Sequence, residues 1–189
     1  MTSRLLFAFD DRVTLQDDGT LVSYCYTRHL VDRYRYLADH VTFIVRGNAM
    51  EPFEWFDDAT MICVPDMKRN FRPATLRQLR RRVSDLVSKH DIVVARLPSI
   101  LGSYALRSAW HHDKPVIVEF VGCPWDALWN YSLKTKFAAP FFWAKNRYLT
   151  NRADYVHYVT DKFLQNRYPT TGYSLAASDV EIEMAPPKL

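Results

Sequence analysis

The sequence has few glycines and cysteines and no long apolar run, and each shortage excludes a class of protein. Its 189 residues include 5 Gly and neither a GxGxxG nor a GxxxxGK[ST] motif, which leaves little support for a dinucleotide site or a P-loop. The 3 Cys are scattered without CxxC spacing, which favours a reducing compartment over a zinc site or disulfide framework. The longest apolar run, residues 137–144 with one proline, is far shorter than the roughly 20 residues of a membrane-spanning helix. These absences predict a cytoplasmic protein without a bound metal ion or cofactor.

Composition predicts a folded domain with a sizeable core, and the charge is unevenly distributed. Hydrophobic residues make up 48% and charged residues 24%, as in ordinary globular proteins. The net charge is only +4, yet residues 68–84 contain seven Lys or Arg, residues 131–152 contain five, and neither segment contains Asp or Glu. Concentrated positive charge favours phosphate-rich partners. Nucleic acid is not expected as a partner, because the overall charge is modest and no DNA- or RNA-reading motif is present.

Short apolar runs alternate with longer helical patterns along the chain. The predicted strands lie at 5–9, 41–45, 61–64, 91–97, 116–121 and 153–159. The predicted helices lie at 27–38, 74–89, 100–112, 133–151 and 161–167. This alternation is typical of βαβ units, so we expect the α/β class: a single Rossmann-like domain with a mostly parallel sheet and helices on both faces. Residues 1–169 are expected to form this domain, and the polar segment 170–189 a linker or tail. A break is expected near Pro140.

The segment 114–126 carries the most specific local signals. Glu119 interrupts an otherwise buried strand, and a buried carboxylate is costly unless it is paired, so Glu119 needs a partner or the open edge of the sheet. Gly122 permits close approach of another group to the backbone. Trp125 and Asp126 then lie in a rigid loop at the carboxyl edge of the sheet, where α/β proteins bind ligands. The alternative is that Trp125 caps the core and Asp126 is the N-cap of a helix.

Acidic residues after two predicted strands are also compatible with a receiver domain, in which an aspartate accepts a phosphoryl group. Asp10 and Asp11 follow the first strand, and Asp66 follows a later one. However, Lys114 precedes a strand, whereas the lysine of a receiver domain ends one. In the simpler interpretation, Asp10 and Asp11 are solvated residues at a strand end.

Several stretches follow one another in the order and spacing of a known family. They are Arg96-Leu97-Pro98-Ser99, Lys114-Pro115 with Val118-Glu119, the run 122–126, and the run 153–169. Together they resemble the N-terminal domain of GT-B glycosyltransferases, and most of all the retaining family-four enzymes that build bacterial cell-surface polysaccharide. The likeness extends from about residue 30 to about residue 185.

The resemblance implies a two-domain enzyme of which this chain is the acceptor half. In such enzymes the N-terminal domain binds the acceptor, and a C-terminal domain binds the nucleotide-sugar donor across a cleft. The reaction would transfer a sugar to a cell-surface polysaccharide or a lipid-linked acceptor, with the donor domain separate or missing. Many relatives carry a histidine where Val121-Gly122 stands here. The alternative is a non-catalytic binding domain, or a truncated remnant with no activity of its own.

The resemblance also implies where the site residues lie. The residues expected to line the cleft are Arg96, Gly122, Cys123, Trp125 and Thr160. Asp126 is expected to be a catalytic carboxylate that orients the acceptor, and Arg12 and Lys162 are expected near a phosphate.

Many relatives work at the inner face of the cell membrane, and segment 131–152 fits such a location. Its basic and aromatic residues expected to contact the membrane are Lys134, Lys136, Phe141, Trp143, Lys145 and Arg147. Each basic residue near an anionic leaflet contributes about 1 kcal/mol of attraction. We therefore expect peripheral contact with an anionic membrane surface. The alternative is that the aromatic residues belong to the core and the lysines to a solvated face.

Overall fold

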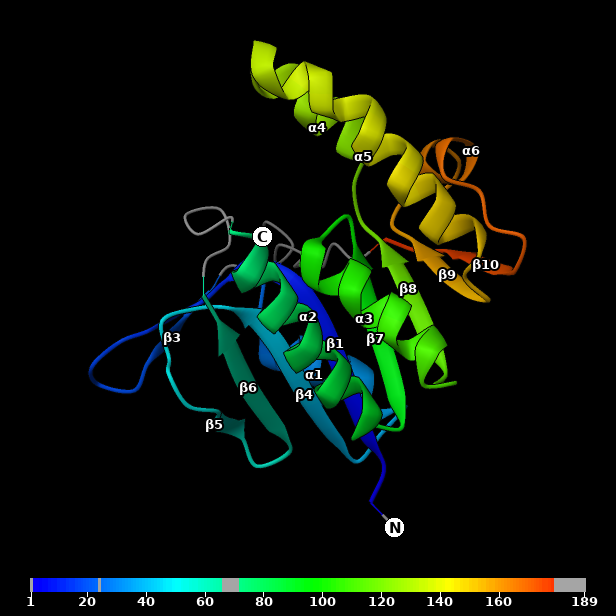
Figure 1. Cartoon of the computed structure of the whole chain (residues 1–189). Helices are drawn as coiled ribbons and strands as arrows, with labels where there is room; N and C mark the ends of the chain where they lie inside the picture. The colour runs from blue at the N-terminus through cyan, green and yellow to red at the C-terminus, as the bar shows by residue number, and fades with distance from the viewer. Residues whose placement is uncertain (1, 24, 66–71, 179–189) are drawn as a thin grey trace, which may run out of the picture.

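An eight-stranded sheet runs through the protein, as seen in a computed structural model that describes residues 2–23, 25–65 and 72–178 (Figure 1). Across the sheet, the strands are β10 (Tyr173–Ala176), β9 (Tyr155–Tyr158), β8 (Val116–Phe120), β7 (Ile92–Leu97), β1 (Arg4–Arg12), β4 (His40–Arg46), β6 (Ala59–Val64) and β5 (Phe53–Phe56). All neighbouring pairs are parallel except β5 and β6, which are antiparallel. A short hairpin of β2 (Thr14–Leu15) and β3 (Leu21–Val22) follows β1. The expected α/β fold with a mostly parallel sheet is confirmed.

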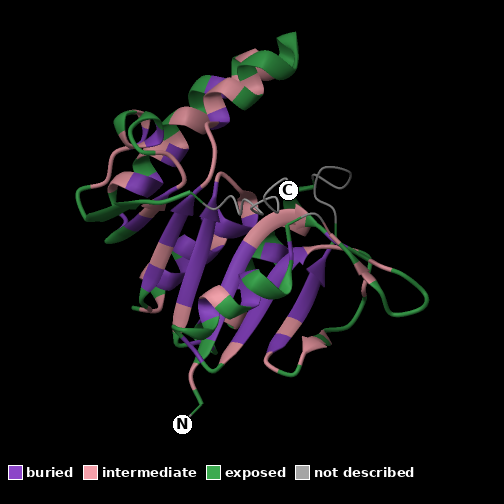
Figure 2. Ribbon diagram, turned by 180° about the vertical axis from the view of Figure 1, so that it is seen from behind, coloured by how far each residue is buried: buried purple, intermediate pink, exposed green. Residues whose placement is uncertain are grey.

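Helices cover both faces of the sheet, as expected. They are α1 (Arg28–Arg35), α2 (Pro73–Ser88), α3 (Ile100–His111), α4 (Pro124–Tyr131), α5 (Leu133–Asn151) and α6 (Phe163–Arg167). Buried residues of α2, α3 and α5 share a core cluster with one face, and those of α1 share a cluster with the other. From behind, α1 lies over the middle of the sheet (Figure 2).

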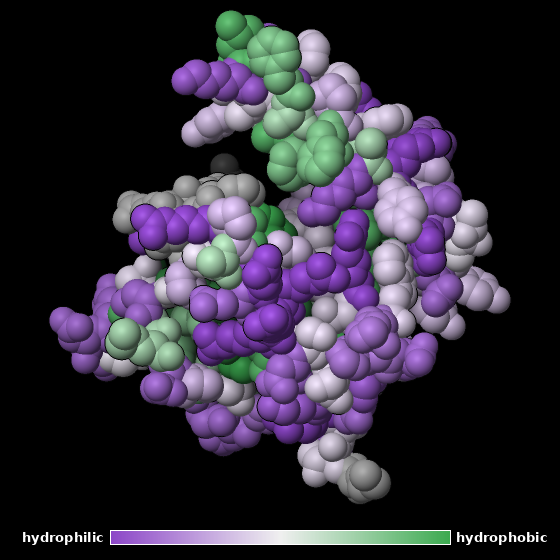
Figure 3. Space-filling view, viewed as in Figure 1, coloured by the Kyte–Doolittle hydropathy of each residue, from purple (hydrophilic) through white to green (hydrophobic). Residues whose placement is uncertain are grey.

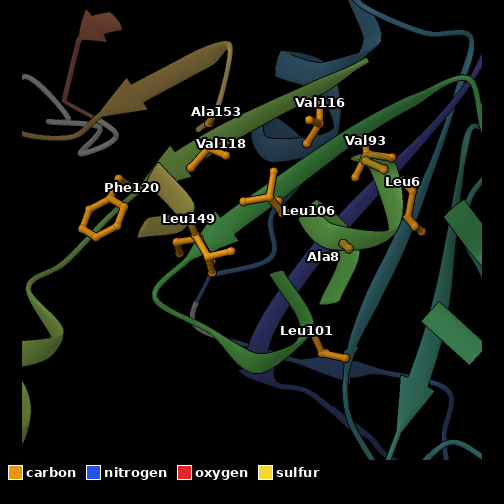
Figure 4. Close-up of a cluster of buried hydrophobic side chains, with 14 of the residues drawn as sticks. Leu6, Ala8, Val93, Leu101, Leu106, Val116, Val118, Phe120, Leu149 and Ala153 are labelled. Atoms are coloured by element: carbon orange, nitrogen blue, oxygen red, sulfur yellow. The ribbon is translucent and has the colours of Figure 1, made fainter. Parts of the chain in front are cut away.

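The sequence builds these two cores by alternation along each strand. In β1, Leu6 and Ala8 face α2 and α3, whereas Leu5 and Phe7 face α1, and all four are fully buried. A strand covered on both faces is apolar at successive positions, which explains the unbroken runs in the sequence. Figure 4 shows the first cluster, in which strand residues meet Leu101 and Leu106 of α3 and Leu149 of α5.

The helices α4 and α5 extend beyond the carboxyl edge of the sheet (Figure 1). Trp125 and Asp126, predicted to lie in a loop, belong instead to α4, which packs along α5. The expected break at Pro140 is absent, because α5 is continuous from Leu133 to Asn151. Pro140 is exposed, so water can bond to the carbonyl group that loses its helical partner there. Ser132 caps α5 in a reciprocal arrangement with Thr135.

The segment expected to be a linker contributes a strand. Tyr173–Ala176 forms β10, which pairs in parallel with β9 at the edge of the sheet, so the ordered domain extends past residue 169. Tyr173 and Leu175 are exposed, and the strand is held by backbone hydrogen bonds such as Tyr173 N to the Asp154 carbonyl at 2.7 Å. A strand without a buried face leaves no apolar pattern to find in the sequence. Residues 179–189 lie outside the described part of the chain.

Candidate functional site

The carboxyl ends of the parallel strands lie along one edge of the sheet, and α4 follows β8 there (Figure 1). Asp126 lies in the first turn of α4, whereas the N-cap is Cys123, so the N-cap alternative for Asp126 is wrong. Arg167 Nη1, from α6, donates hydrogen bonds to both Asp126 carboxylate oxygens at 2.9 and 2.8 Å. This hydrogen bond lowers the pKa of Asp126, which stays ionised at neutral pH. Asp126 can therefore accept a hydrogen bond from a hydroxyl group, but it is a weak proton acceptor.

An aromatic cavity of about 460 Å³ lies beside this ion pair. Its walls are Trp125, Trp143, Arg147, Asn166 and Arg167. The rings of Trp125 and Trp129 stack with centroids 5.2 Å apart, which fixes the orientation of Trp125. Aromatic walls combined with a few polar groups are typical of small-ligand sites. Cys123 contacts the same ion pair, since Arg167 Nη1 lies 3.3 Å from its sulfur.

Arg96 and Glu119 lie on the face of the sheet that α1 covers. They are neighbours in the β7–β8 register, and Arg96 Nε lies 3.3 Å from Glu119 Oε2. The Tyr34 hydroxyl of α1 donates a hydrogen bond to Glu119, and His157 Nδ1 of β9 lies 3.8 Å from Glu119 Oε1. The expectation that Glu119 needs a partner is confirmed. Arg96 differs from the expectation, because its side chain is only 8% exposed and pairs with Glu119 instead of lining an open cleft.

Arg96, Glu119, Tyr34 and His157 form a row of interacting polar side chains. The charges in this row set the pKa values of Glu119 and His157. Burial alone would raise the pKa of Glu119, but His157, Arg96 and Tyr34 together leave it below its ordinary value. Glu119 in turn raises the pKa of His157 against the effect of burial. His157 Nε2 also lies 2.8 Å from the Ala177 carbonyl, so the row reaches the end of β10.

The remaining predicted site residues are spread along the carboxyl edge. Among the described residues, a Cβ atom added to Gly122 would meet only Pro98 Cδ, at 4.0 Å, so none of them approaches that backbone closely. The Thr160 side chain accepts a hydrogen bond from Leu164 N at 3.0 Å near the start of α6. Arg12 and Lys162 are exposed and are not brought together, because three strand spacings of about 4.8 Å separate β1 from β9.

Asp10 is engaged in the fold and is not a solvated residue. Its carboxylate accepts hydrogen bonds from Ile100 N at 2.6 Å and Leu101 N at 2.8 Å, which tie the end of β1 to the start of α3. Burial raises the pKa of Asp10 against these bonds. Because both of its oxygens already accept hydrogen bonds, this carboxylate is not available to accept a phosphoryl group. Asp66, the other candidate phosphoacceptor, lies outside the described residues.

A second cavity, of about 470 Å³, lies between α3 and α5 and was not found from the sequence. Its lining residues are Leu76, Ile100, Ser103, Tyr104, Arg107, Phe141, Phe142, Ala144, Lys145 and Tyr148. Phe141 and Lys145 were predicted to contact a membrane, whereas no pattern in the sequence indicated a role for Arg107 or Tyr104. They lie in α3, and only the tertiary structure places α3 next to α5.

The predicted membrane residues fall into two groups. Lys134 is exposed and Phe141 is 68% exposed, whereas Lys136 lies over the Trp129 ring, 5.4 Å from its centroid. Arg147 lies over Trp143 and donates to the Arg167 carbonyl at 2.9 Å, so these two residues face α6. No helix in residues 2–23, 25–65 or 72–178 is long and apolar enough to cross a membrane.

The fold is a single Rossmann-like α/β domain of the kind found in GT-B glycosyltransferases. A family model described as a glycosyl transferase 4-like domain matches residues 25–166, and the chain belongs to this family. Protein CapJ of Staphylococcus aureus is 36% identical over 88 residues, which cover 46% of this chain and 22% of CapJ.

Solved structures share the fold at low sequence identity. Sucrose-phosphate synthase from Thermosynechococcus elongatus superposes with a TM-score of 0.61 at 12% identity, over 94% of this chain and 48% of that chain. Arabidopsis thaliana UGT89C1, complexed with UDP, superposes with a TM-score of 0.52 at 11% identity, over 98% of this chain and 54% of that chain. The chain thus spans about half the length of these two structures and less than a quarter of CapJ.

Proposed function

We propose that this chain is the acceptor-binding half of a glycosyltransferase that moves a sugar from a nucleotide-sugar to a cell-surface polysaccharide or a lipid-linked acceptor. The observation that carries the proposal is the family match over residues 25–166, which contains the carboxyl ends of β4, β6, β7, β8 and β9. UGT89C1, which shares the fold, is complexed with UDP. A donor-binding half would supply the nucleotide-sugar site, and the donor would reach the acceptor at this edge.

In this proposal, Asp126 orients the acceptor. Its carboxylate is ionised and fixed by Arg167, and it stands beside the cavity walled by Trp125 and Trp143. A hydroxyl group of the acceptor would donate to Asp126 while its sugar ring lies against the indole walls. Holding a hydroxyl group in the attacking position lowers the barrier through orientation alone.

Replacing Asp126 with Asn should lower kcat/KM for the acceptor about 10- to 100-fold in the enzyme assembled with its donor-binding half. The reason is that one hydrogen bond to a charged group is lost, worth about 1.5–3 kcal/mol. The KM for the nucleotide-sugar should not change, because the donor is bound elsewhere. Initial rates with varied acceptor and varied donor measure both quantities.

The matched control for this experiment is Asp17→Asn, in the exposed turn between β2 and β3. It should leave both kinetic constants unchanged. If kcat/KM for the acceptor is the same in Asp126→Asn as in the control, Asp126 has no orienting role. If the assembled enzyme transfers sugar to no acceptor, the proposed function itself fails.

The proposal also includes peripheral contact with the inner face of the cell membrane through the projecting end of α4 and α5. The exposed side chains there include Tyr131 (82%), Leu133 (74%) and Phe137 (85%), with Lys134 between them. Hydrophobic side chains form patches on these projecting helices, next to hydrophilic ones, in the space-filling view (Figure 3). Apolar side chains that enter the headgroup region, together with adjacent lysines, are typical of surface-bound helices.

The variant Leu133→Ser with Phe137→Ser should reduce partitioning of the protein onto anionic vesicles at least tenfold. Two exposed apolar side chains, each worth about 1.5–3 kcal/mol when fully buried, are lost from the contact. Sedimentation with vesicles containing phosphatidylserine measures the effect. Tyr36→Ser, at an equally exposed residue (92%) next to α1, is the control and should partition like the wild type. Equal partitioning of both variants would contradict the membrane contact.

A further inference from the structure

Exposed apolar side chains form a continuous stripe along α5. Leu133, Phe137 and Phe141 follow one another at four-residue spacing, and Tyr148 continues the same face of the helix. Their exposed fractions are 74%, 85%, 68% and 51%. From Leu133 to Lys145 the helix rises about 18 Å. Scattered exposed apolar residues are ordinary, but a stripe on one helical face marks an interaction site.

The stripe leads into the cavity between α3 and α5, and two cations stand at that end. Phe141 and Tyr148 belong to both the stripe and the cavity wall, and Arg107 and Lys145 line the same cavity. The described residues of the wall include no acidic side chain. Figure 3 shows hydrophobic side chains gathered on the projecting helices.

Lys145 and Arg107 place two like charges on the wall of one cavity. Burial and the charge of Arg107 lower the pKa of Lys145, while Asp10 acts in the opposite direction. The Asp10 carboxylate, however, already accepts two backbone hydrogen bonds from α3. An anion placed between Lys145 and Arg107 would relieve this repulsion and would meet charge-assisted donors in a largely apolar setting.

We propose that this groove binds a lipid phosphate, with its phosphate or diphosphate held between Lys145 and Arg107 and its hydrocarbon chain laid along the stripe of α5. The inference rests on the proposed function, because it names the acceptor as a lipid-linked one and places its anchor. The chain would run from the cavity toward Phe137 and Leu133, which the proposed membrane contact places in the bilayer surface. A soluble phosphate would use the cations but not the apolar wall that Phe141 and Tyr148 add to the same cavity, and a neutral lipid would leave the cations unexplained.

The test is calorimetric binding of three probes that separate these chemistries: farnesyl diphosphate, inorganic pyrophosphate and farnesol. The wild-type protein should bind farnesyl diphosphate at least 100-fold more tightly than pyrophosphate or farnesol. Lys145→Gln combined with Arg107→Gln should weaken binding of farnesyl diphosphate about 100-fold, at about tenfold per lost cation. Phe141→Ser should weaken it about tenfold.

Two surface variants serve as matched controls, and other outcomes overturn the inference. Lys89→Gln, at an exposed lysine at the end of α2, and Tyr36→Ser should bind like the wild type. Pyrophosphate bound as tightly as farnesyl diphosphate would reduce the groove to an anion site. If farnesol binds as tightly as farnesyl diphosphate and the double variant has no effect, the groove is only an apolar surface. If no probe binds, the groove is not a ligand site.

Sugar transfer to a lipid-free acceptor separates this inference from the proposed function. Transfer by the assembled enzyme without binding of farnesyl diphosphate would overturn the lipid phosphate site alone. Binding as expected without transfer to any acceptor would support the groove and overturn the proposed function.

Discussion

Replacing Glu119 with Gln is expected to lower the free energy of unfolding by about 3–5 kcal/mol, because it leaves the Arg96 charge buried without its carboxylate. The side chains of Arg96 and Glu119 are 8% and 5% exposed, so water cannot replace the lost partner. Glutamine is as large as glutamate, which excludes a cavity as the cause. Urea denaturation followed by circular dichroism measures the change as a shift of the midpoint at constant slope.

Two further variants show whether the charge is responsible. Asp85→Asn breaks the exposed pair with Lys89, which are 59% and 61% exposed, and it should cost less than about 1 kcal/mol. Arg96→Met combined with Glu119→Leu removes both charges and should recover most of the loss of Glu119→Gln. A loss for Glu119→Gln no greater than that for Asp85→Asn would mean that other groups compensate Arg96.

The pH dependence of stability provides a second readout of the same row. Because Glu119 has a lowered pKa in the folded state, its stabilisation is present above the unfolded pKa and is lost as the pH falls through the folded value. His157 has a raised pKa, so its stabilisation is present below the unfolded pKa of about 6.5 and is lost as the pH rises through the folded value. In Glu119→Gln both losses should shrink, and unfolding midpoints between pH 3 and pH 9 measure this. An unchanged profile would contradict the coupling.

Replacing Gly102 with Ala is expected to destabilise the protein by about 3 kcal/mol, although alanine is the better helix former by about 1 kcal/mol. Gly102 lies in the first turn of α3, where an added Cβ would collide with the Arg96 carbonyl oxygen and stand 2.6 Å from Ser99 Oγ. The carbonyl belongs to β7 and cannot move without disturbing the sheet. The steric penalty therefore outweighs the gain in helix propensity. Thermal or urea denaturation measures the loss.

Gly122→Ala is the natural comparison for Gly102→Ala. The nearest atom to its added Cβ is Pro98 Cδ at 4.0 Å, which is ordinary van der Waals contact. Its unfolding free energy should change by less than about 1 kcal/mol. If Gly102→Ala is as stable as Gly122→Ala, the start of α3 can shift away from β7 without cost.

Much of the fold follows from local periodicity. The strands β1, β4, β6, β7, β8 and β9 and most of the helices could be predicted because apolar spacing is a short-range property of the chain. The same holds for α2, which was predicted at 74–89 and is observed at Pro73–Ser88, with proline in its first turn. The need of Glu119 for a partner could also be predicted, because a lone carboxylate inside a buried strand has only a few physical solutions.

The amino-acid sequence by itself thus determined the fold class, the two basic segments and the resemblance to a glycosyltransferase half, since these depend on composition and order along the chain. The tertiary structure decided the rest. The register of β7, β8 and β9 selects Arg96 and His157 as the neighbours of Glu119, and pairing with β9 makes a strand of exposed residues in β10. Arg107 and Lys145 share a groove because α3 and α5 pack on the same face of the sheet. Contacts between residues far apart in the chain depend on register and packing, and no local pattern encodes them.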